Sequence, residues 1–335
     1  MTPYRFTRLA TACALGSALL LSACSSSSQS GQSGQSGDAS ASGSQSGTSC
    51  TLSDDAPDVD RSGEGNFPDA TGGFGEDPTI SAGTGDEPDQ VLVKTLSEGD
   101  GDTVGSSDFI LANYTGTLWD GTVFDSSYSN GQAVAFGLDQ VVSGWKYGLA
   151  DQHVGDRVEI VIPCEWGYGG TDQGTIPAGS TLVFVVDIED AVDGTDTSAL
   201  TAATATGDAL PAGISVDGDL GSEPTVAFSG DTAPGESTTT LATGTGEAIA
   251  DSDYVLYQAV GSYFEDPSSM SSTWSSVGAQ LFQPGIGELV GQTVGSRLLF
   301  VFPPTADASE SGATEAETST TVMVVDVLAT LSPQS

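Results

Sequence analysis

The stretch that decides the fold is Asp108-Phe-Ile-Leu-Ala-Asn-Tyr-Thr-Gly116. Its run of apolar and β-branched residues predicts a strand that extends over residues 108–118. Further runs of this kind, bounded by Gly and Asp turns, lie at 91–97, 156–163 and 181–190. We therefore expect these strands to pair as an antiparallel sheet.

A short helix is predicted between two of these strands. Val142, Trp145 and Leu149 recur at i, i+3 and i+7, which places one apolar face on a helix. Gly155 lies just past its end. A sheet with a short helix packed on it belongs to the α+β class.

The predicted elements occur twice along the chain. Four pairs of segments match in order: Gly75-Glu-Asp-Pro-Thr-Ile80 with Gly221-Ser-Glu-Pro-Thr-Val226, Asp108-Phe-Ile-Leu111 with Asp253-Tyr-Val-Leu256, Val154-Gly-Asp-Arg157 with Val294-Gly-Ser-Arg297, and Val185-Val-Asp187 with Val324-Val-Asp326. The offset falls only from 146 residues (Gly75 to Gly221) to 139 (Asp187 to Asp326). Two tandem copies of one domain explain this pattern.

The first copy carries an ordered series of short motifs. They are Tyr114-Thr-Gly116, Gly121 with Phe124-Asp-Ser-Ser127, Gly144-Trp145, Val154-Gly155, Tyr168-Gly169, Ile176-Pro177 and Thr181-Leu-Val-Phe184. Over roughly residues 75–190 this series resembles the FKBP-type peptidyl-prolyl cis-trans isomerases, the macrolide-binding immunophilins. The resemblance implies two tandem FKBP-like domains, each a curled antiparallel sheet of about five strands around a short helix.

The same resemblance implies an aromatic pocket. Trp145 would form its floor and Ile176 its rim, and Asp125 and Tyr168 would be its polar members. The walls would be Tyr114, Phe124, Val141, Val142 and Phe184. The chain departs from the family pattern near Phe136, where Val134 is aligned with a second aromatic wall residue.

Such a pocket suits prolyl isomerisation, which breaks no bond and needs neither a nucleophile nor a metal. Rotation about an X-Pro bond faces a barrier of about 18–20 kcal/mol. A dry pocket can grip the proline ring and desolvate the imide, which favours the twisted state. We assign catalysis to Tyr114, Phe124, Asp125, Tyr168 and Phe184, and substrate binding to Trp145, Val141, Val142 and Ile176. We expect proline-containing exported polypeptides as substrates, a macrolide as an inhibitor, and no cofactor or metal.

Other interpretations stay open. Aromatic residues on strands are usually core residues, and Trp145 alone would be read in that way. The fold could also serve a client-binding chaperone, or an acidic surface lipoprotein, without significant turnover. The chain has 46 acidic and 7 basic side chains and a net charge of −39, which argues against a nucleic-acid partner.

The second copy lacks the residues of the predicted pocket. Alignment places Ala259 at the Tyr114 position, Ile286 at Trp145 and Met323 at Phe184. Trp274 and Ser275 are aligned with Phe124 and Asp125. We therefore expect a degenerate FKBP-like domain without isomerase activity.

The N-terminus has the pattern of an export signal. Arg5 and Arg8 precede an apolar run, Leu9 to Leu21, that is too short to span a bilayer. The following Leu21-Ser-Ala-Cys24 resembles the bacterial lipobox, so we expect a lipid on Cys24 that anchors the protein to the membrane, outside the cytoplasm. A Ser/Gly/Gln-rich segment then predicts a flexible tether.

Two cysteines remain in the expected mature chain, Cys50 and Cys164. In an oxidising compartment they could form a disulfide, and the alternative is two unpaired thiols. Zinc is not expected, because His153 is the only histidine and no Cys-x-x-Cys spacing occurs. We divide the chain into a signal peptide at 1–23, a lipidated and disordered tether at 24–74, an isomerase domain at 75–192, a linker at 193–212 and a degenerate domain at 213–335.

Overall fold

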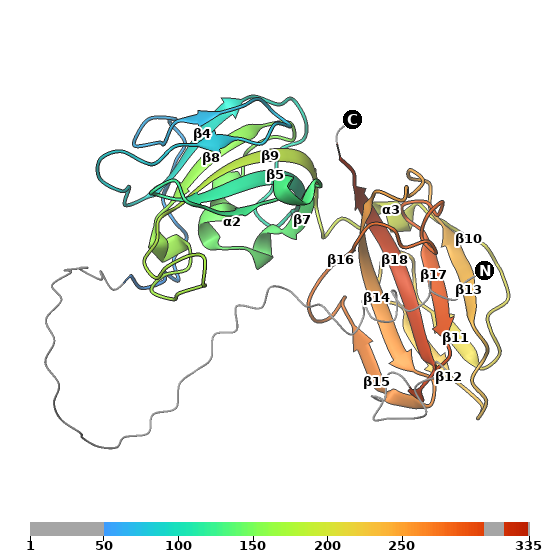
Figure 1. Ribbon diagram of the computed structural model, residues 1–335. Coiled ribbons are helices and arrows are strands. Elements are labelled where there is room, and N and C mark those ends of the chain that lie inside the picture. The colour runs from blue at the N-terminus through green and yellow to red at the C-terminus, as the bar shows by residue number, and fades with distance from the viewer. Residues whose placement is uncertain (1–49, 305–317, 334–335) are drawn as a thin grey trace, which may run out of the picture.

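The computed structural model describes residues 50–304 and 318–333, which form two lobes (Figure 1). The predicted signal peptide, Cys24 and the first part of the tether lie outside the described residues. Each lobe is built on one seven-stranded sheet, and the two sheets have the same strand order. Within residues 50–304 and 318–333, no helix has both the length and the apolar character to cross a bilayer.

The first lobe, residues 50–192, contains the predicted strands. Its sheet has the order β1-β4-β8-β9-β5-β6, and β7 pairs with the remaining length of β5. The strands are β1 (Val59–Asp60), β4 (Val91–Ser97), β5 (Phe109–Leu118), β6 (Val123–Ser126), β7 (Val134–Gly137), β8 (Arg157–Ile162) and β9 (Leu182–Val192). All pairs are antiparallel except β1 with β4, so the sheet is mixed, where we expected an antiparallel sheet of about five strands.

The second lobe, residues 193–304 and 318–333, repeats this arrangement. Its sheet has the order β10-β13-β17-β18-β14-β15, with β16 paired to β14. The strands are β10 (Thr204–Ala205), β13 (Ser237–Thr243), β14 (Tyr254–Tyr263), β15 (Asp266–Ser272), β16 (Gln280–Phe282), β17 (Arg297–Phe302) and β18 (Thr321–Leu331). Gly116 pairs with Phe184 in one sheet and Gly261 with Met323 in the other, so the register also repeats.

Short elements complete both lobes. Two-stranded ribbons, β2 (Ala70–Thr71) with β3 (Thr79–Ile80) and β11 (Ile214–Asp217) with β12 (Thr225–Phe228), accompany the first and the second sheet. The helices are η1 (Tyr128–Asn130), η2 (Leu138–Gln140), α2 (Ser143–Leu149), η3 (Cys164–Trp166) and α3 (Ser198–Thr201). The helix predicted around Trp145 is therefore present as α2.

Two predicted boundaries are corrected by these contacts. Residues 50–74, expected as disordered tether, supply β1 and β2 and are joined to the first sheet. Residues 193–212, expected as linker, contain α3, whose Leu200 is buried, and β10, which extends the second sheet. Each of these segments contributes only one or two buried residues to its lobe. Its sequence is therefore mostly polar and gave no periodic signal of a strand or helix.

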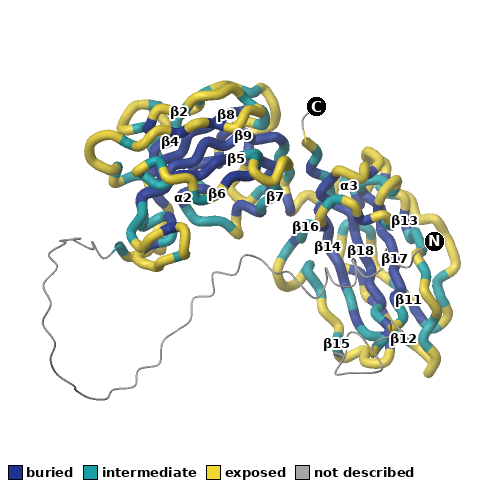
Figure 2. Tube along the Cα trace, in the orientation of Figure 1, coloured by how far each residue is buried: buried dark blue, intermediate teal, exposed yellow. Residues whose placement is uncertain are grey.

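Helix α2 packs against the inner face of the first sheet, and the residues between them are buried (Figure 2). Its Gly144 permits this close approach, because a Cβ at that position would lie 2.3 Å from Cγ2 of Ile162. Trp145 and Leu149 then enter the same apolar core as Ile160 and Ile162 on β8. The helix is therefore fixed at the distance at which Trp145 faces β5 and β9.

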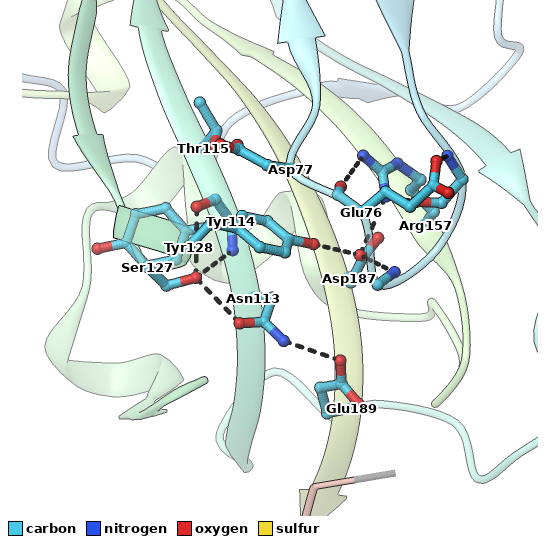
Figure 3. Close-up of polar contacts among 12 residues, drawn as sticks. Glu76, Asp77, Asn113, Tyr114, Thr115, Ser127, Tyr128, Arg157, Asp187 and Glu189 are labelled. Carbon is cyan, nitrogen blue, oxygen red and sulfur yellow. Dashed lines mark hydrogen bonds and ion pairs between the residues drawn. The ribbon is translucent and has the colours of Figure 1, made fainter. Parts of the chain in front are cut away.

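A buried ion pair joins β8 to β9 on the other face of the sheet (Figure 3). Arg157 and Asp187 are paired in register, and their side chains are each 1% exposed, with Nη1 and Oδ2 3.0 Å apart. Asp187 also accepts hydrogen bonds from the Gly75 backbone N–H and the Tyr128 hydroxyl. The second lobe repeats the pair as Arg297 and Asp326, with Nε and Oδ1 2.6 Å apart.

Glu159, also on β8, is another buried acid, and none of the ion pairs among residues 50–304 and 318–333 includes it. Its relative exposure is 0%, and neither carboxyl oxygen has a hydrogen-bond partner among the described residues. Desolvation raises its pKa from 4.5 to about 7, against the opposing influence of Lys94 and with a smaller contribution from Asp69. The corresponding position of the second lobe is Leu299, which is fully buried.

We predict that Glu159→Gln stabilises the protein at neutral and higher pH. The native carboxyl holds its proton up to pH of about 7, whereas the unfolded carboxyl releases it near 4.5, so stability is lost as pH rises between these values. The variant avoids this loss, so its free energy of unfolding should exceed that of the wild type by about 2–4 kcal/mol at pH 8 and differ little below pH 4.5.

Urea denaturation across pH 4–8 measures this difference. The matched control is Glu98→Gln, which changes an exposed acid and should leave the pH dependence of stability as it is. Equal pH dependence of Glu159→Gln and wild type would contradict the prediction.

Candidate functional site

All nine residues predicted for the pocket lie at one end of the first lobe's core. Tyr114, Trp145, Ile176 and Phe184 are buried in it. Phe124, Val141, Val142 and Tyr168 are partly buried against the same cluster. Asp125 is exposed and reaches the group through its bond to Tyr114. Strands β5, β6 and β9, helix α2 and the loop after η3 each contribute to this assembly.

The aromatic rings contact one another mainly by their edges. Trp145 lies 5.5 Å from Tyr114 and 5.4 Å from Phe184 between ring centroids, with interplanar angles of 84° and 72°. Phe124 meets Phe184 at 5.4 Å and 86°. Edge-to-face contacts are the favoured geometry of aromatic pairs, and they leave ring faces available to an apolar ligand.

Phe136 on β7 is the pocket residue that the sequence prediction missed. Its ring lies 5.8 Å from Tyr114 and 5.3 Å from Trp145, again edge to face. Our alignment assigned this wall position to Val134 and is therefore wrong by two residues. The alternation of Val134, Phe136 and Leu138 along β7 and η2 was the signal that could have found it, because residues at i and i+2 share a face of a strand.

The polar side of the site is formed by Tyr114, Asp125 and Tyr168. The Tyr114 hydroxyl donates a hydrogen bond of 2.5 Å to Oδ2 of Asp125. Burial, followed by this hydrogen bond and the charge of Asp125, raises the pKa of Tyr114. Burial and then the charge of Asp125 also raise the pKa of Tyr168. Both tyrosines therefore stay protonated and able to donate at neutral pH.

Gly116 makes room for two of the aromatic walls. A Cβ at this position would lie 2.7 Å from Cζ of Phe124 and 2.8 Å from Cε1 of Phe184. These distances are too short for real carbon contacts, so a larger residue would displace the rings. The Tyr-Thr-Gly motif of β5 thus supplies one wall with Tyr114 and the space for two others with Gly116.

An N-terminal strap, residues 50–61, holds the loop that carries Tyr168. Cys50 and Cys164 form a disulfide with 6.3 Å between their Cα atoms, which resolves the alternatives left open by the sequence. The Ser53 N–H donates to the Glu165 carbonyl over 3.0 Å. Leu52 lies against Gly169, next to Tyr168, so the strap follows this loop closely.

The far end of the strap contacts helix α2. The Nη2 atom of Arg61 donates to the backbone carbonyls of Tyr147 and Ala150, over 2.6 and 2.8 Å. These carbonyls lie at the C-terminal end of the helix, where a cation is electrostatically favoured. The strap therefore supports two parts of the pocket, the Tyr168 loop and the helix of Trp145.

The second lobe has a different set of buried residues at the positions of the predicted pocket. Ala259 and Met323 occupy the positions of Tyr114 and Phe184, as expected, and Ile286 is buried in the same cluster. Tyr257 stands at the position of Ala112 and stacks on Phe282, with 3.7 Å between ring centroids. In place of α2, residues 283–291 form turns.

One alignment of the second copy is corrected by strand register. Ser271 is paired with Gly261 as Asp125 is with Gly116, so Ser271 corresponds to Asp125, and Met270 to Phe124. Trp274, which we had aligned with Phe124, instead corresponds to Tyr128. The two hairpins differ by only one residue between these paired positions (125 − 116 = 9 and 271 − 261 = 10), so the sequence alignment was displaced by four residues from the structural one.

Comparison with known proteins supports the expected family. Residues 101–189 match the family model described as FKBP-type peptidyl-prolyl cis-trans isomerase. A probable FKBP-type peptidyl-prolyl cis-trans isomerase of Haemophilus influenzae is 46% identical over 101 residues, which cover 30% of this chain and 42% of that protein. FK506-binding protein 2 of Debaryomyces hansenii is 47% identical over 85 residues, which cover 25% of this chain and 63% of that protein. The crystal structure of FkpA from Escherichia coli aligns with a TM-score of 0.30 at 39% identity, and the alignment covers 30% of this chain and 48% of the FkpA chain. The chain thus spans about half the length of these relatives.

We predict that removal of the disulfide destabilises the first lobe. A Cys50→Ser/Cys164→Ser variant should unfold with a free energy lower by about 2–4 kcal/mol, because the bond closes a loop with a sequence separation of 114 residues. Urea denaturation with and without dithiothreitol measures the effect. The reductant should destabilise the wild type and leave the double variant unchanged; a wild type indifferent to the reductant would show that the cysteines are unpaired.

Proposed function

We propose, from the match of residues 101–189 to the model of the FKBP-type peptidyl-prolyl cis-trans isomerase family, that the protein accelerates cis-trans isomerisation of X-Pro bonds in exported polypeptides. The observation that carries the proposal is the set of edge-to-face contacts that Trp145 makes with Tyr114, Phe136 and Phe184. This arrangement presents ring faces and few polar groups to a bound proline.

The proposed mechanism is preferential binding of the twisted imide. Rotation removes amide resonance and leaves a carbonyl that is less well solvated by a polar medium than the planar amide is. An apolar pocket replaces water around the imide, so the planar ground state loses more solvation than the twisted state does. The side chains of Phe124 and Phe184 meet edge to face and close this pocket against water.

The polar residues orient the substrate. The Tyr168 hydroxyl, kept protonated by burial and by the charge of Asp125, is able to donate to a substrate carbonyl. Asp125 holds the Tyr114 hydroxyl, which fixes the ring beside Trp145. Tyr114, Phe124, Asp125, Tyr168 and Phe184 are thus proposed as catalytic, and Trp145, Val141, Val142 and Ile176 as substrate-binding residues. A macrolide inhibitor would occupy the same pocket.

The second lobe is proposed to be a degenerate FKBP-like domain without turnover. It shares strand order and register with the first lobe, including the buried Arg297–Asp326 pair. Its Tyr257, at the position of Ala112, stacks on Phe282, the counterpart of Phe136, and Ala259 and Met323 replace Tyr114 and Phe184. A fold kept without its pocket also favours, as a second candidate, a client-binding role for the whole chain in which turnover is incidental.

The protein is proposed to act outside the cytoplasm, attached to the membrane through lipid on Cys24. The Leu21-Ser-Ala-Cys24 motif after an apolar run supports the anchor. The Cys50–Cys164 disulfide supports an oxidising compartment, where such bonds persist.

We predict that the proline-peptide turnover of the full chain depends on the pocket. Phe124→Ala should reduce kcat/KM about 10- to 100-fold, because it removes a ring whose burial contributes about 1.5–3 kcal/mol. Tyr168→Phe should reduce it less, about 3- to 10-fold, because only one hydrogen-bond donor is lost. A protease-coupled proline tetrapeptide assay, with and without a macrolide, measures both.

Val277→Ala is the matched control, since this apolar side chain is 67% exposed in the second lobe and should leave turnover unchanged. If Phe124→Ala and Tyr168→Phe both retain the wild-type rate, the proposed mechanism is wrong.

The anchor is tested by the location of the protein in cells. Cys24→Ser should release the protein from the membrane fraction into the soluble fraction, because the residue that would carry the lipid is gone. Immunoblotting of fractionated cells measures this shift. A Cys24→Ser protein that stays in the membrane fraction to the wild-type extent would argue against lipidation at this residue.

A further inference from the structure

The two lobes meet through equivalent surfaces. A buried cluster between them contains Phe109 and Leu111 from β5 and Tyr254 and Leu256 from β14. These residues correspond in the two sheets, because Phe109 pairs with Val192 as Tyr254 pairs with Leu331. The lobes therefore pack approximately as two copies related by a two-fold axis would. Figure 1 shows β7 on the side of the first lobe that faces β14 and β16.

One polar contact breaks this symmetry. The buried Tyr254 hydroxyl donates to the Ala133 carbonyl over 3.1 Å, and the backbone of Ala135 opposes the rise in the pKa of Tyr254 that burial causes. The equivalent residue in the first lobe is Phe109, which has no hydroxyl to offer to β16. The second lobe thus supports a strand of the first lobe by hydrogen bonding, and the reverse bond is absent from this pair of positions.

Ala133 directly precedes β7, which among the described strands pairs with β5 alone. An edge of this kind has backbone groups without partners in the sheet, and it is held less firmly than an inner strand. Ala133 and Ala135 belong to the cluster between the lobes, together with Ala279 and Leu281 of the second lobe. Tyr254 therefore supplies a hydrogen bond at the start of this edge strand.

The opposite face of β7 carries Phe136 into the pocket. Side chains alternate along a strand, so Phe136 points away from the second lobe and contacts Tyr114 and Trp145. A shift of the β7 edge would move this aromatic wall relative to the pocket floor. The position of Phe136 is thus linked through one strand to a hydroxyl of the second lobe.

We propose that Tyr254 is a positioning residue for the isomerase pocket, and that the second lobe serves the reaction by fixing β7 and, through it, Phe136. This inference rests on the proposed function of the first lobe. It gives the lobe without a pocket a role in the same chain: it holds the substrate-binding wall in place and contributes no group to the reaction.

Tyr254→Phe in the full chain tests the proposal, because it removes the hydroxyl and keeps the ring in the interface. KM for the proline tetrapeptide should rise roughly 3- to 10-fold, the equivalent of one lost neutral hydrogen bond, with little change in kcat. The Ala135 amide should exchange faster with solvent, as measured by hydrogen-exchange NMR. Tyr263→Phe, the same change at the other end of β14, is the control and should alter neither value.

A double-variant cycle with Phe136→Ala separates positioning from a general loss of stability. If Tyr254 acts through Phe136, Tyr254→Phe has no further effect on kcat/KM in the Phe136→Ala chain. An equal loss in both backgrounds, or no loss in the wild-type background, overturns the proposal. A wild-type chain without turnover would refute the proposed function instead, and the exchange rate of Ala135 would then decide whether Tyr254 fixes β7.

Discussion

The arrangement of the first lobe depends on one buried ion pair, Arg157 with Asp187. Enclosing two opposite charges is costly unless their remaining donors and acceptors also find partners. Nη1 of Arg157 meets the Gly73 carbonyl, and Nη2 donates to the Glu76 carbonyl. Oδ2 of Asp187 also accepts hydrogen bonds from the Tyr128 hydroxyl and the Gly75 N–H, while Oδ1 of Asp187 and Nε of Arg157 have no hydrogen-bond partner among the described residues. The segment between β2 and β3 and the segment after β6 are thereby held against the sheet.

The repetition of this pair shows which residues belong to the fold and which to the site. Arg297 and Asp326 reproduce it, and Arg297 reaches the Ser222 carbonyl as Arg157 reaches that of Glu76. Of the proposed pocket residues, Phe136 has a counterpart in Phe282, whereas Tyr114 and Phe184 are replaced by Ala259 and Met323. On the same backbone, the first lobe combines a small Ala112 with an aromatic Tyr114, and the second combines a large Tyr257 with a small Ala259.

The pocket is supported from outside the segment that matches the family. The strap connects the Tyr168 loop and helix α2 to residues before position 62, and Tyr254 connects β7 to residues after position 250. The strap contacts a loop and the end of a helix, and Tyr254 bonds to the residue before an edge strand. Contacts from distant parts of the chain thus stabilise the parts of the site that have the fewest backbone partners.

The sequence by itself determined four strands of the first lobe and the short helix, and it predicted the repeat and nine pocket residues, because these depend on local periodicity and on motifs of fixed spacing. The β4 strand matches its predicted range, and all nine predicted site residues meet. Phe136, the strap and α3 could not be placed in this way. Their roles depend on which surfaces come together across the fold, and a few buried residues in a polar segment give no periodic signal. Only the tertiary structure decided that Cys50 meets Cys164 and that a tyrosine of one lobe holds the edge strand of the other, because such contacts join residues more than 100 positions apart.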